Sequence, residues 1–342
     1  MEITIMSSML MLLCACWFGL MAASPTTPYA LEQAELHFER FIQDFDRHYP
    51  NEHEKQVRFT IFKENLEEIN RLNENSKNTV FGISQFSDIT LEEFSNSYSC
   101  IHTKNYNAQS SPKCSFVTDP DINYKDAPES FDWRENQAVT QVKSQMNCGS
   151  CYAFGATGNI EGQYAIKHQQ LVELSEQQIV DCDHTESGCV LNQQLENSIL
   201  YLLEKGGIEL EADYPYTGHA DKCVFDESKV KVKLSDCHVY NLTSQEKVKQ
   251  LLYHNGPLSI SKLLLAILYK SGVISDAQCD VGGVHHAVLL VGYGTENSEQ
   301  YWLVKNSWAA EWGDQGYFKM HRGEGALSCG MMNPHMASSV VE

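Results

Sequence analysis

Between residues 54 and 73, selected polar and apolar positions recur at intervals of three and four, the spacing of one face of an α-helix. The apolar members of this stripe are Phe62 and Ile69, and the polar members are Glu54, Arg58, Asn65 and Asn73. The pattern predicts an α-helix. An ordinary amphipathic helix would explain the two apolar positions, but the regularly placed polar members argue against that simpler interpretation.

The longest stretch that is almost wholly apolar covers residues 3–23, and the small residues at 22–24 lie at its end. We expect residues 1–23 to be a signal peptide that is cleaved on export. Because Glu2 and no Lys or Arg precedes the run, and because its length approaches that of a membrane span, an uncleaved anchor stays open as the alternative. A second apolar run, residues 263–268, is too short to cross a membrane.

The stretch between Cys100 and Pro120 is rich in Ser, Asn and Thr and lacks apolar periodicity. It is typical of a linker, and we expect proteolytic processing there. The 216 residues from Ala127 to Glu342 are enough for two lobes that share a cleft.

The most informative chemistry lies in the segment Gln145-Met-Asn-Cys148-Gly-Ser-Cys151. Cys151 stands at a predicted helix start, where backbone N–H groups and the helix dipole lower a thiol pKa below its free value of about 8.5. A structural Cys-x-x-Cys metal site is the alternative. It would need a second cysteine pair with fitting spacing, and Cys182 and Cys189 have six residues between them, so we expect no metal.

Two further polar residues, His286 and Asn306, adjoin strand-like apolar runs 135 and 155 residues after Cys151. A lone histidine beside a strand is more often a packed core residue, but the ordered set of cysteine, histidine and asparagine resembles the papain-like cysteine peptidases of the cathepsin L type, including viral and insect members. The stripe at 54–73 resembles the ERFNIN helix of their propeptides. The segment 82–88 resembles their Gly-x-Asn-x-Phe-x-Asp motif, with Ser84 in place of Asn.

The resemblance implies an α+β, papain-like two-lobe fold preceded by a helical inhibitory propeptide. A mainly helical lobe would carry Cys151, a β-barrel-like lobe would carry His286 and Asn306, and the active-site cleft would lie between them. The expected domains are a propeptide over residues 24–126 and a mature peptidase over residues 127–342.

The resemblance also implies a role for each site residue. Cys151 would attack the peptide carbonyl as a thiolate, with His286 as acid and base and Asn306 orienting the imidazole. Gln145 and the Cys151 N–H would form the oxyanion hole, and Trp308 would shield the histidine–asparagine contact. His285 competes for the base role. We choose His286 because the family's histidine directly precedes Ala/Gly-Val.

Cysteine pairing follows from the same resemblance. The implied disulfides are Cys148–Cys189, Cys182–Cys223 and Cys279–Cys329, which would leave Cys151 free. Cys237 would be an odd, buried cysteine that packs as a small hydrophobe, and Cys100 with Cys114 is a further pairing left open. Such bonds persist in oxidising compartments, which agrees with export through the secretory pathway to a lysosome, an acidic vacuole or the extracellular space. Asn241 begins an Asn-Leu-Thr sequon and is a candidate for glycosylation.

The predicted substrate cleft departs from the family pattern. Val190, Leu191 and Asn192 follow Cys189 where the family has Asn-Gly-Gly, and glycines there let a substrate backbone lie against the wall. The remaining candidate substrate-binding positions are Gln193, Gln194, Ser261, Val284, Ala287 and Trp308, with the two glutamines on a wall that is normally apolar.

These changes raise a second hypothesis, a papain-like scaffold that acts as a binding protein. A third is a secreted disulfide module without catalysis. The complete polar set at the predicted site favours an endopeptidase.

Composition adds little beyond its exclusions. A formal net charge of −20 disfavours nucleic acids and anionic membrane surfaces as partners. The expected partners are protein or peptide substrates, the chain's own propeptide as inhibitor, and cystatin-like inhibitors. We expect a monomer without a cofactor.

Overall fold

The computed structural model describes residues 27–98, 114–185, 188–190, 195–263, 266–275, 285–323 and 336–342. The predicted signal segment and the pairing of Cys279 with Cys329 lie outside these residues. Among the helices of the described ranges, none is both long and apolar enough to cross a membrane.

The N-terminal part forms a small helical unit. A 3-10 turn (Leu31–Gln33) leads into α1 (Ala34–Asp44), which is followed by α2 (Glu52–Glu74), β1 (Val80–Phe81) and α3 (Leu91–Tyr98). The Asn51 side chain caps α2 by accepting a bond from the Glu54 N–H at 2.9 Å. The helix predicted over residues 54–73 is thereby confirmed, and its apolar stripe is buried, with Phe62 and Ile69 fully inaccessible.

The polar members of the α2 stripe hold the segment that follows it. Asn65 donates to the backbone carbonyls of Ser87 and Ile89 at 2.9 and 3.1 Å. Asn73 exchanges two bonds of 2.9 Å with the backbone of Phe81. The regular placement of these side chains therefore fixes the extended chain between α2 and α3 against the helix.

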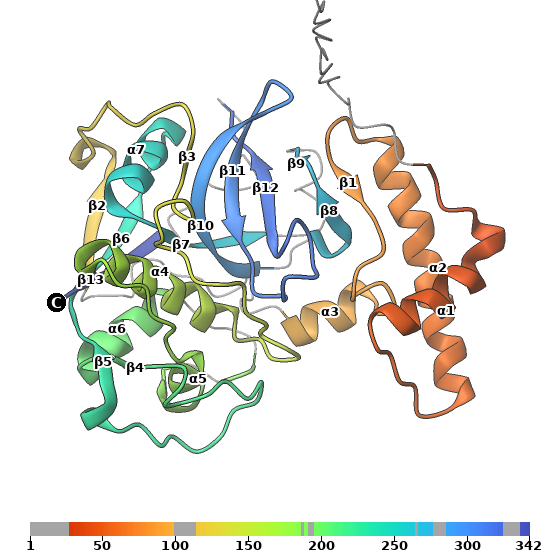
Figure 1. The fold of residues 1–342 in the computed structure, drawn as a ribbon, viewed down its shortest axis with the longest axis horizontal. Coiled ribbons are helices and arrows are strands. Elements are labelled where there is room, and N and C mark those ends of the chain that lie inside the picture. The colour runs from red at the N-terminus through yellow and green to blue at the C-terminus, as the bar shows by residue number, and fades with distance from the viewer. Residues whose placement is uncertain are drawn as a thin grey trace, which may run out of the picture.

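The larger part of the molecule contains a helical lobe and a sheet lobe (Figure 1). The helical lobe consists of α4 (Cys151–His168), α5 (Glu176–Cys182) and α6 (Leu195–Lys205), beside a short pair of strands, β4 (Ile208–Glu209) and β5 (Val230–Val232). A 3-10 turn (Glu227–Lys229) precedes β5, and α7 (Gln245–Asn255) lies in the sheet lobe.

The sheet lobe is mainly antiparallel, and its strands follow the order β2-β6-β13-β7-β10-β11-β12-β9, with β3 paired to β10. The strands are β2 (Ser115–Thr118), β3 (Phe131–Asp132), β6 (Leu234–Asn241), β7 (Leu258–Leu263), β9 (Val273–Ile274), β10 (His285–Glu296), β11 (Glu299–Lys305), β12 (Tyr317–His321) and β13 (Met336–Val341). Within the described residues this path does not close on itself. The two-lobe α+β fold is as expected, but the barrel-like lobe is an open sheet.

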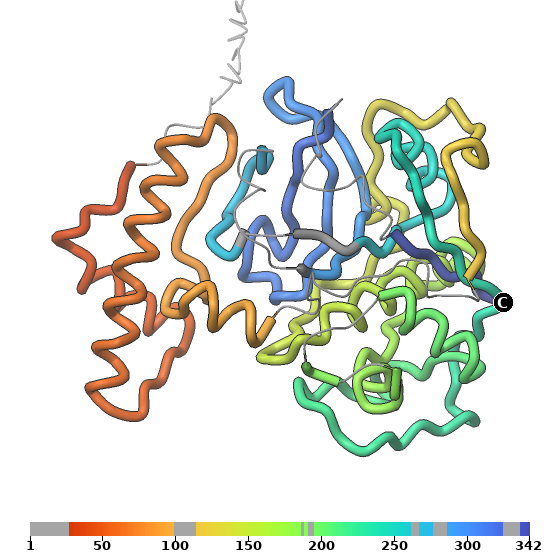
Figure 2. Tube along the Cα trace, turned by 180° about the vertical axis from the view of Figure 1, so that it is seen from behind, coloured from red at the N-terminus to blue at the C-terminus, as the bar shows by residue number. Residues whose placement is uncertain are grey.

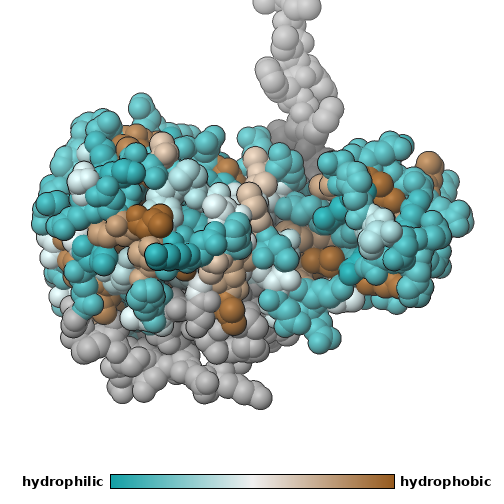
Figure 3. Space-filling view, turned by 90° about the horizontal axis from the view of Figure 1, so that it is seen from below, coloured by the Kyte–Doolittle hydropathy of each residue, from teal (hydrophilic) through white to brown (hydrophobic). Residues whose placement is uncertain are grey.

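The N-terminal helices form a smaller mass at one end of the molecule (Figures 1 and 2). Hydrophilic side chains predominate on the visible face of both parts (Figure 3). The two parts are joined by strand pairing, because β1 pairs with β8 (Tyr269–Ser271) of the larger part. Ser84 adds a bond of 2.6 Å from its hydroxyl to the carbonyl of Ile267. Ser84, at the position where the sequence departs from the motif it resembles, thus still docks the N-terminal unit.

Three disulfides are described, and they correct part of the expected pairing. Cys148–Cys189 and Cys182–Cys223 are present as expected. The third joins Cys114 to Cys237. The interpretation of Cys237 as an unpaired hydrophobe is therefore wrong, although it is buried, and Cys114 is not available to Cys100. The physical reason is that β2 runs beside β6 and brings two cysteines 123 residues apart into contact.

Candidate active site

Cys151 is the first residue of α4, and its side chain is fully buried. Ser150 precedes it in a non-helical conformation and provides no side-chain cap. The Cys148–Cys189 disulfide holds the chain just before the helix. The prediction that Cys151 lies at a helix N-terminus is therefore confirmed. The helix dipole at this position favours a negatively charged sulfur.

Cys151 is nevertheless bonded in a disulfide, which corrects the expectation that it is free. The other six described cysteines pair with one another, so its partner lies outside the described residues. A sulfur atom in a disulfide cannot ionise to a thiolate. In this form of the chain Cys151 is held in an unreactive state, and a thiol has to be released before it can act as a nucleophile.

His286 lies on β10 and Asn306 directly follows β11, and antiparallel pairing of these strands brings them together. The Nε2 atom of His286 lies 2.7 Å from Oδ1 of Asn306. That contact fixes the imidazole orientation and, since an amide oxygen only accepts, it places a proton on Nε2. The remaining ring nitrogen, Nδ1, is buried and has no hydrogen-bond partner among the described residues, so it is available to a reacting group.

The first turns of α4 face this part of β10. Gly155 lies one turn after Cys151 on the same face of the helix. A β-carbon placed on it would lie 3.7 Å from both the Cβ of Ala287 and the carbonyl oxygen of Val288. A small cavity of about 20 Å³ is lined by Phe154, Gly155, Ala287 and Asn306 among others. The helix that begins at Cys151 and the strand that begins at His285 thus pack directly on each other.

Burial lowers the pKa of His286 from its usual value of 6.5 to about 4, and the hydrogen bond with Asn306 opposes that shift. The ring stacks on Trp308 with centroids 4.7 Å apart. The neutral imidazole is therefore favoured in this form of the chain, in which His286 is buried and Cys151 is disulfide-bonded. A thiolate nearby would favour the charged form and raise the same pKa.

Gln145 is buried and is held by two donors at its side-chain oxygen. The Ser307 hydroxyl donates to Oε1 at 2.8 Å and the Trp308 indole N–H donates at 3.1 Å. These bonds direct the amide nitrogen of Gln145 toward the start of α4, where it donates to the Cys148 carbonyl at 2.8 Å. The amide nitrogen is the group that could stabilise a developing oxyanion.

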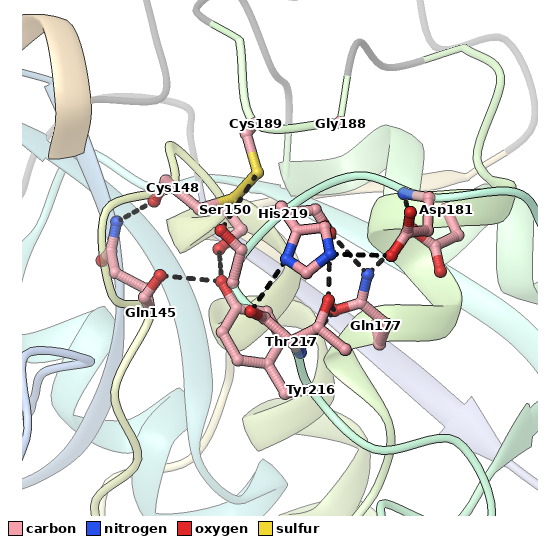
Figure 4. The surroundings of a disulfide bond; sticks show 12 residues. Gln145, Cys148, Ser150, Gln177, Asp181, Gly188, Cys189, Tyr216, Thr217 and His219 are labelled. Atoms are coloured by element: carbon pink, nitrogen blue, oxygen red, sulfur yellow. Dashed lines mark hydrogen bonds and ion pairs between the residues drawn. A yellow bond between two sulfur atoms is a disulfide. The ribbon is translucent and has the colours of Figure 1, made fainter.

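Sequence reasoning missed two residues that support this loop. The Tyr216 hydroxyl lies 2.6 Å from the Ser150 hydroxyl and donates to the Gln145 backbone carbonyl at 2.8 Å. Figure 4 shows Gln145 and Ser150 converging on this tyrosine beside the Cys148–Cys189 disulfide. No local pattern identifies Tyr216, because it is 71 residues from Gln145 in the chain.

The candidate substrate-binding residues are only partly described. Ala287 and Trp308 are buried, with 1% and 2% of their surface exposed. Ser261 belongs to β7 and pairs with Ala287, although its side chain lies outside the described residues. Leu191, Asn192, Gln193, Gln194 and Val284 also lie outside them. For His285, the histidine that competes with His286 for the base role, only the backbone is described, as the first residue of β10.

The described ranges contain no group of three or more His, Cys, Asp or Glu side chains that could hold a metal ion. Asn241 is exposed at the end of β6, and Thr243 of its sequon hydrogen-bonds to the Asp119 carboxylate.

The N-terminal unit reaches the site through α3 and the segment before it. The Tyr98 carbonyl lies 3.3 Å from Nε2 of Gln145, and Gln85 donates to the Trp308 carbonyl at 2.6 Å. The rings of Phe86 and Phe94 contact Trp308 edge to face, with centroids 5.3 and 5.1 Å away. The helical unit therefore covers Trp308 and occupies the Gln145 donor.

Two family models match separate parts of the chain. Residues 127–339 match the papain family cysteine protease model, and residues 38–94 match the cathepsin propeptide inhibitor domain. A viral cathepsin from Spodoptera litura multicapsid nucleopolyhedrovirus is 40% identical over 324 residues, covering 92% of this chain and 93% of its own. One from Heliothis zea nuclear polyhedrosis virus is 39% identical over 333 residues, covering 93% and 88%.

Solved structures show the same architecture. Digestive procathepsin L2 proteinase from Tenebrio molitor larval midgut has a TM-score of 0.79 and 31% identity, covering 90% of this chain and 99% of its own. Procathepsin L 3 from the same source has a TM-score of 0.77 and 28% identity, covering 90% and 98%. The chain therefore belongs to the papain family of cysteine proteases and carries its own cathepsin propeptide inhibitor domain.

Proposed function

We propose that the chain is a latent cysteine endopeptidase in which Cys151, once reduced, attacks the scissile peptide carbonyl as a thiolate. The thioester forms as the amine leaves with a proton from the His286 imidazolium. Water then attacks the thioester, with the neutral imidazole taking its proton, and the thiol is regenerated. A structural scaffold would not need a cysteine at a helix N-terminus as well as an oriented histidine.

Asn306 orients the imidazole in this proposal. The single observation that carries the assignment is the 2.7 Å contact between Oδ1 of Asn306 and Nε2 of His286, whose ring stacks on Trp308. Because Nε2 is occupied, Nδ1 is the ring nitrogen left to exchange a proton with the sulfur and the leaving amine.

Gln145 and the Cys151 backbone N–H would stabilise the oxyanion. One such donor is typically worth about 3 kcal/mol in the transition state. Since Nε2 of Gln145 already meets the Tyr98 carbonyl, the propeptide occupies this donor until it is removed. The same contact supports latency of the proform.

Acid activation is supported by the contacts of the propeptide. Arg58 of α2 pairs with Glu54 of the same helix at 2.7 Å and with Glu93 of α3 at 2.9 Å. The pair with Glu93 joins the two helices. The hydrogen bond from Arg58 lowers the pKa of Glu93 below its usual 4.5. The stability from this pair is thus present above pH 4.5 and is lost as the pH falls through the lower folded-state pKa.

A secretory route is supported by the three described disulfides, which persist in oxidising compartments. Within that route we propose an acidic vacuole or the extracellular space as the place of action. We propose a monomer that cystatin-like inhibitors can block after activation.

The test is acid incubation of the reduced full-length chain with a cysteine-directed epoxide, followed by mass mapping. We expect the label on Cys151 of an N-terminally shortened chain, and no processing in the Cys151→Ser variant. His286→Ala should abolish activity. The matched control His285→Ala should keep activity and mainly shift its pH profile. Activity retained by Cys151→Ser or His286→Ala would refute the assignment, and an unlabelled but folded chain would favour a binding scaffold.

A further inference from the structure

The segment of residues 114–126, which precedes the matched protease region, is built into the catalytic part of the molecule. Strand β2 runs parallel to β6, with Ser115 opposite His238 and Thr118 opposite Asn241. Next to this pairing, Cys114 is bonded to Cys237. Both sulfurs are buried, because the two residues are only 6% and 1% exposed.

The middle of the segment contributes to the core. Ile122 is 4% exposed and belongs to the same apolar cluster as Tyr240 and Leu242. Burying such a side chain typically contributes about 1.5–3 kcal/mol. Its backbone carbonyl accepts a bond from the Lys247 ammonium of α7.

Polar contacts fix the segment before and after Ile122. The Asp119 carboxylate accepts bonds from the backbone N–H, at 3.0 Å, and the hydroxyl of Thr243. Farther along, Nε2 of His254 lies 2.6 Å from the Asp126 carboxylate, and the His254 ring stacks on Tyr124 with centroids 4.1 Å apart. The segment is therefore held along its length and not only at its cysteine.

The inhibitory contacts lie elsewhere. Residues 27–98 dock on β8, Ile267, Trp308 and Gln145, whereas residues 114–126 dock on β6 and α7. Figures 1 and 2 show β2 and the propeptide helices at opposite ends of the molecule. A cut between residues 98 and 114 breaks the peptide chain between the inhibitory helices and this strand.

We infer that residues 114–126 remain on the enzyme after the inhibitory helices are removed, covalently held through Cys114–Cys237 as a permanent strand of the sheet. If the chain is also cut before Ala127, the segment stays as a short second chain on the disulfide. This inference depends on the proposed proteolytic maturation only for its biological setting. The tether itself is a property of the folded chain.

The test separates the two ideas by using the inactive Cys151→Ser full-length chain with added trypsin. Trypsin can cut after Lys104 and Lys113 in the linker and after Lys125 at the end of the segment. Free thiols are alkylated first, and the digest is purified by gel filtration in about 2 M urea without reductant. Intact masses are then compared before and after reduction.

We expect the non-reduced catalytic fragment to retain the peptide that contains Cys114, and reduction to release that peptide wherever Lys125 has been cut. The matched control, Cys114→Ser with Cys237→Ser, should lose the cut peptide on the same column. A non-reduced fragment that starts near Ala127 with an alkylated Cys237 would overturn the inference. So would equal retention by the control, because contacts other than the disulfide would then hold the peptide.

A second arm uses the wild-type chain, first treated with mild phosphine to release the Cys151 thiol and then activated in acid, with the same non-reduced mass measurement. Retention of the Cys114 peptide supports the inference, and its loss with an alkylated Cys237 opposes it. Failure of the chain to process itself would count against the proposed peptidase function, while the trypsin arm still decides the tether.

Discussion

The backbone carbonyl of Tyr98 lies 3.3 Å from the side-chain nitrogen of Gln145, so the end of propeptide helix α3 meets the donor that an oxyanion would need. In the proposed mechanism, the oxygen of a substrate carbonyl would bind the same Gln145 nitrogen. Three aromatic rings of the same segment, Phe86, Phe94 and Tyr98, form one cluster with Trp308. A single contact region thereby blocks the oxyanion donor and covers the residue that shields His286.

Reductant should control the reactivity of Cys151. The residue is disulfide-bonded in the described form of the chain, and an alkylating reagent requires a thiolate. We expect an iodoacetamide label on Cys151 to be at background in the untreated full-length chain and to appear after mild phosphine reduction. Peptide mapping of the non-reduced chain should find Cys151 joined to one of the five cysteines outside the described residues, namely Cys14, Cys16, Cys100, Cys279 and Cys329. Quantitative labelling without reductant would contradict this expectation.

Arg58 should stabilise the latent form. It bonds to Glu54, Glu93 and the Asp88 carbonyl, and so links α2 to the segment that covers the site. We expect Arg58→Gln to weaken propeptide docking by about 1–2 kcal/mol, allowing for partial exposure of these pairs. This corresponds to a roughly 5- to 30-fold faster onset of activity of the reduced proform at neutral pH.

Arg71 provides the matched control for that substitution. It lies exposed on the same helix and pairs only with the half-buried Glu68 among the described side chains, by bonds of 2.6 Å. Arg71→Gln should therefore leave the onset of activity unchanged within twofold. Equal acceleration by both substitutions would mean that helix charge, and not the Arg58 contacts, controls latency.

Residues 54–73 show how far the sequence alone predicts this fold. Spacing predicted the helix because helical contacts are local, and the ordered cysteine, histidine and asparagine predicted the site through family resemblance. The Cys114–Cys237 bond could not be predicted in this way, because it depends on β2 lying beside β6 across a separation of 123 residues. The Tyr216 support of Gln145 is equally non-local, and the open path of the sheet depends on pairings between distant strands.

The free energy of unfolding of the oxidised proform should decrease as the pH is lowered, over a range set by the pKa of His286. Burial lowers its folded-state pKa to about 4 from 6.5, so the unfolded chain binds more protons between these values. The stability is present above pH 6.5 and is lost as the pH falls toward 4. At about 1.4 kcal/mol per pKa unit, this histidine accounts for about 3 kcal/mol.

Denaturant unfolding at pH 7 and pH 4.5 measures this loss. We expect a smaller pH-dependent change in the His286→Gln variant, which keeps a polar side chain beside Asn306. His48→Gln is the control, because that side chain is 83% exposed. An unchanged pH dependence in His286→Gln would show that other groups, such as Glu93, dominate the acid loss.

The substitutions in the predicted cleft should change substrate preference. Leu191 and Asn192 replace the family's glycine pair, so we expect an extended substrate to lie less close to that wall, and Gln193 and Gln194 to make the S2 pocket more polar. Apolar contact with a large P2 side chain is worth roughly 1–3 kcal/mol, and mixed walls reduce it. We therefore expect slow turnover of a Phe-Arg dipeptide reporter and a higher kcat/KM after Leu191→Gly with Asn192→Gly. Val190→Gly is the neighbouring control and should give a smaller gain. Strong selection of Phe or Leu at P2 by the unaltered enzyme, with no gain from the double glycine change, would mean that these residues do not form the cleft wall.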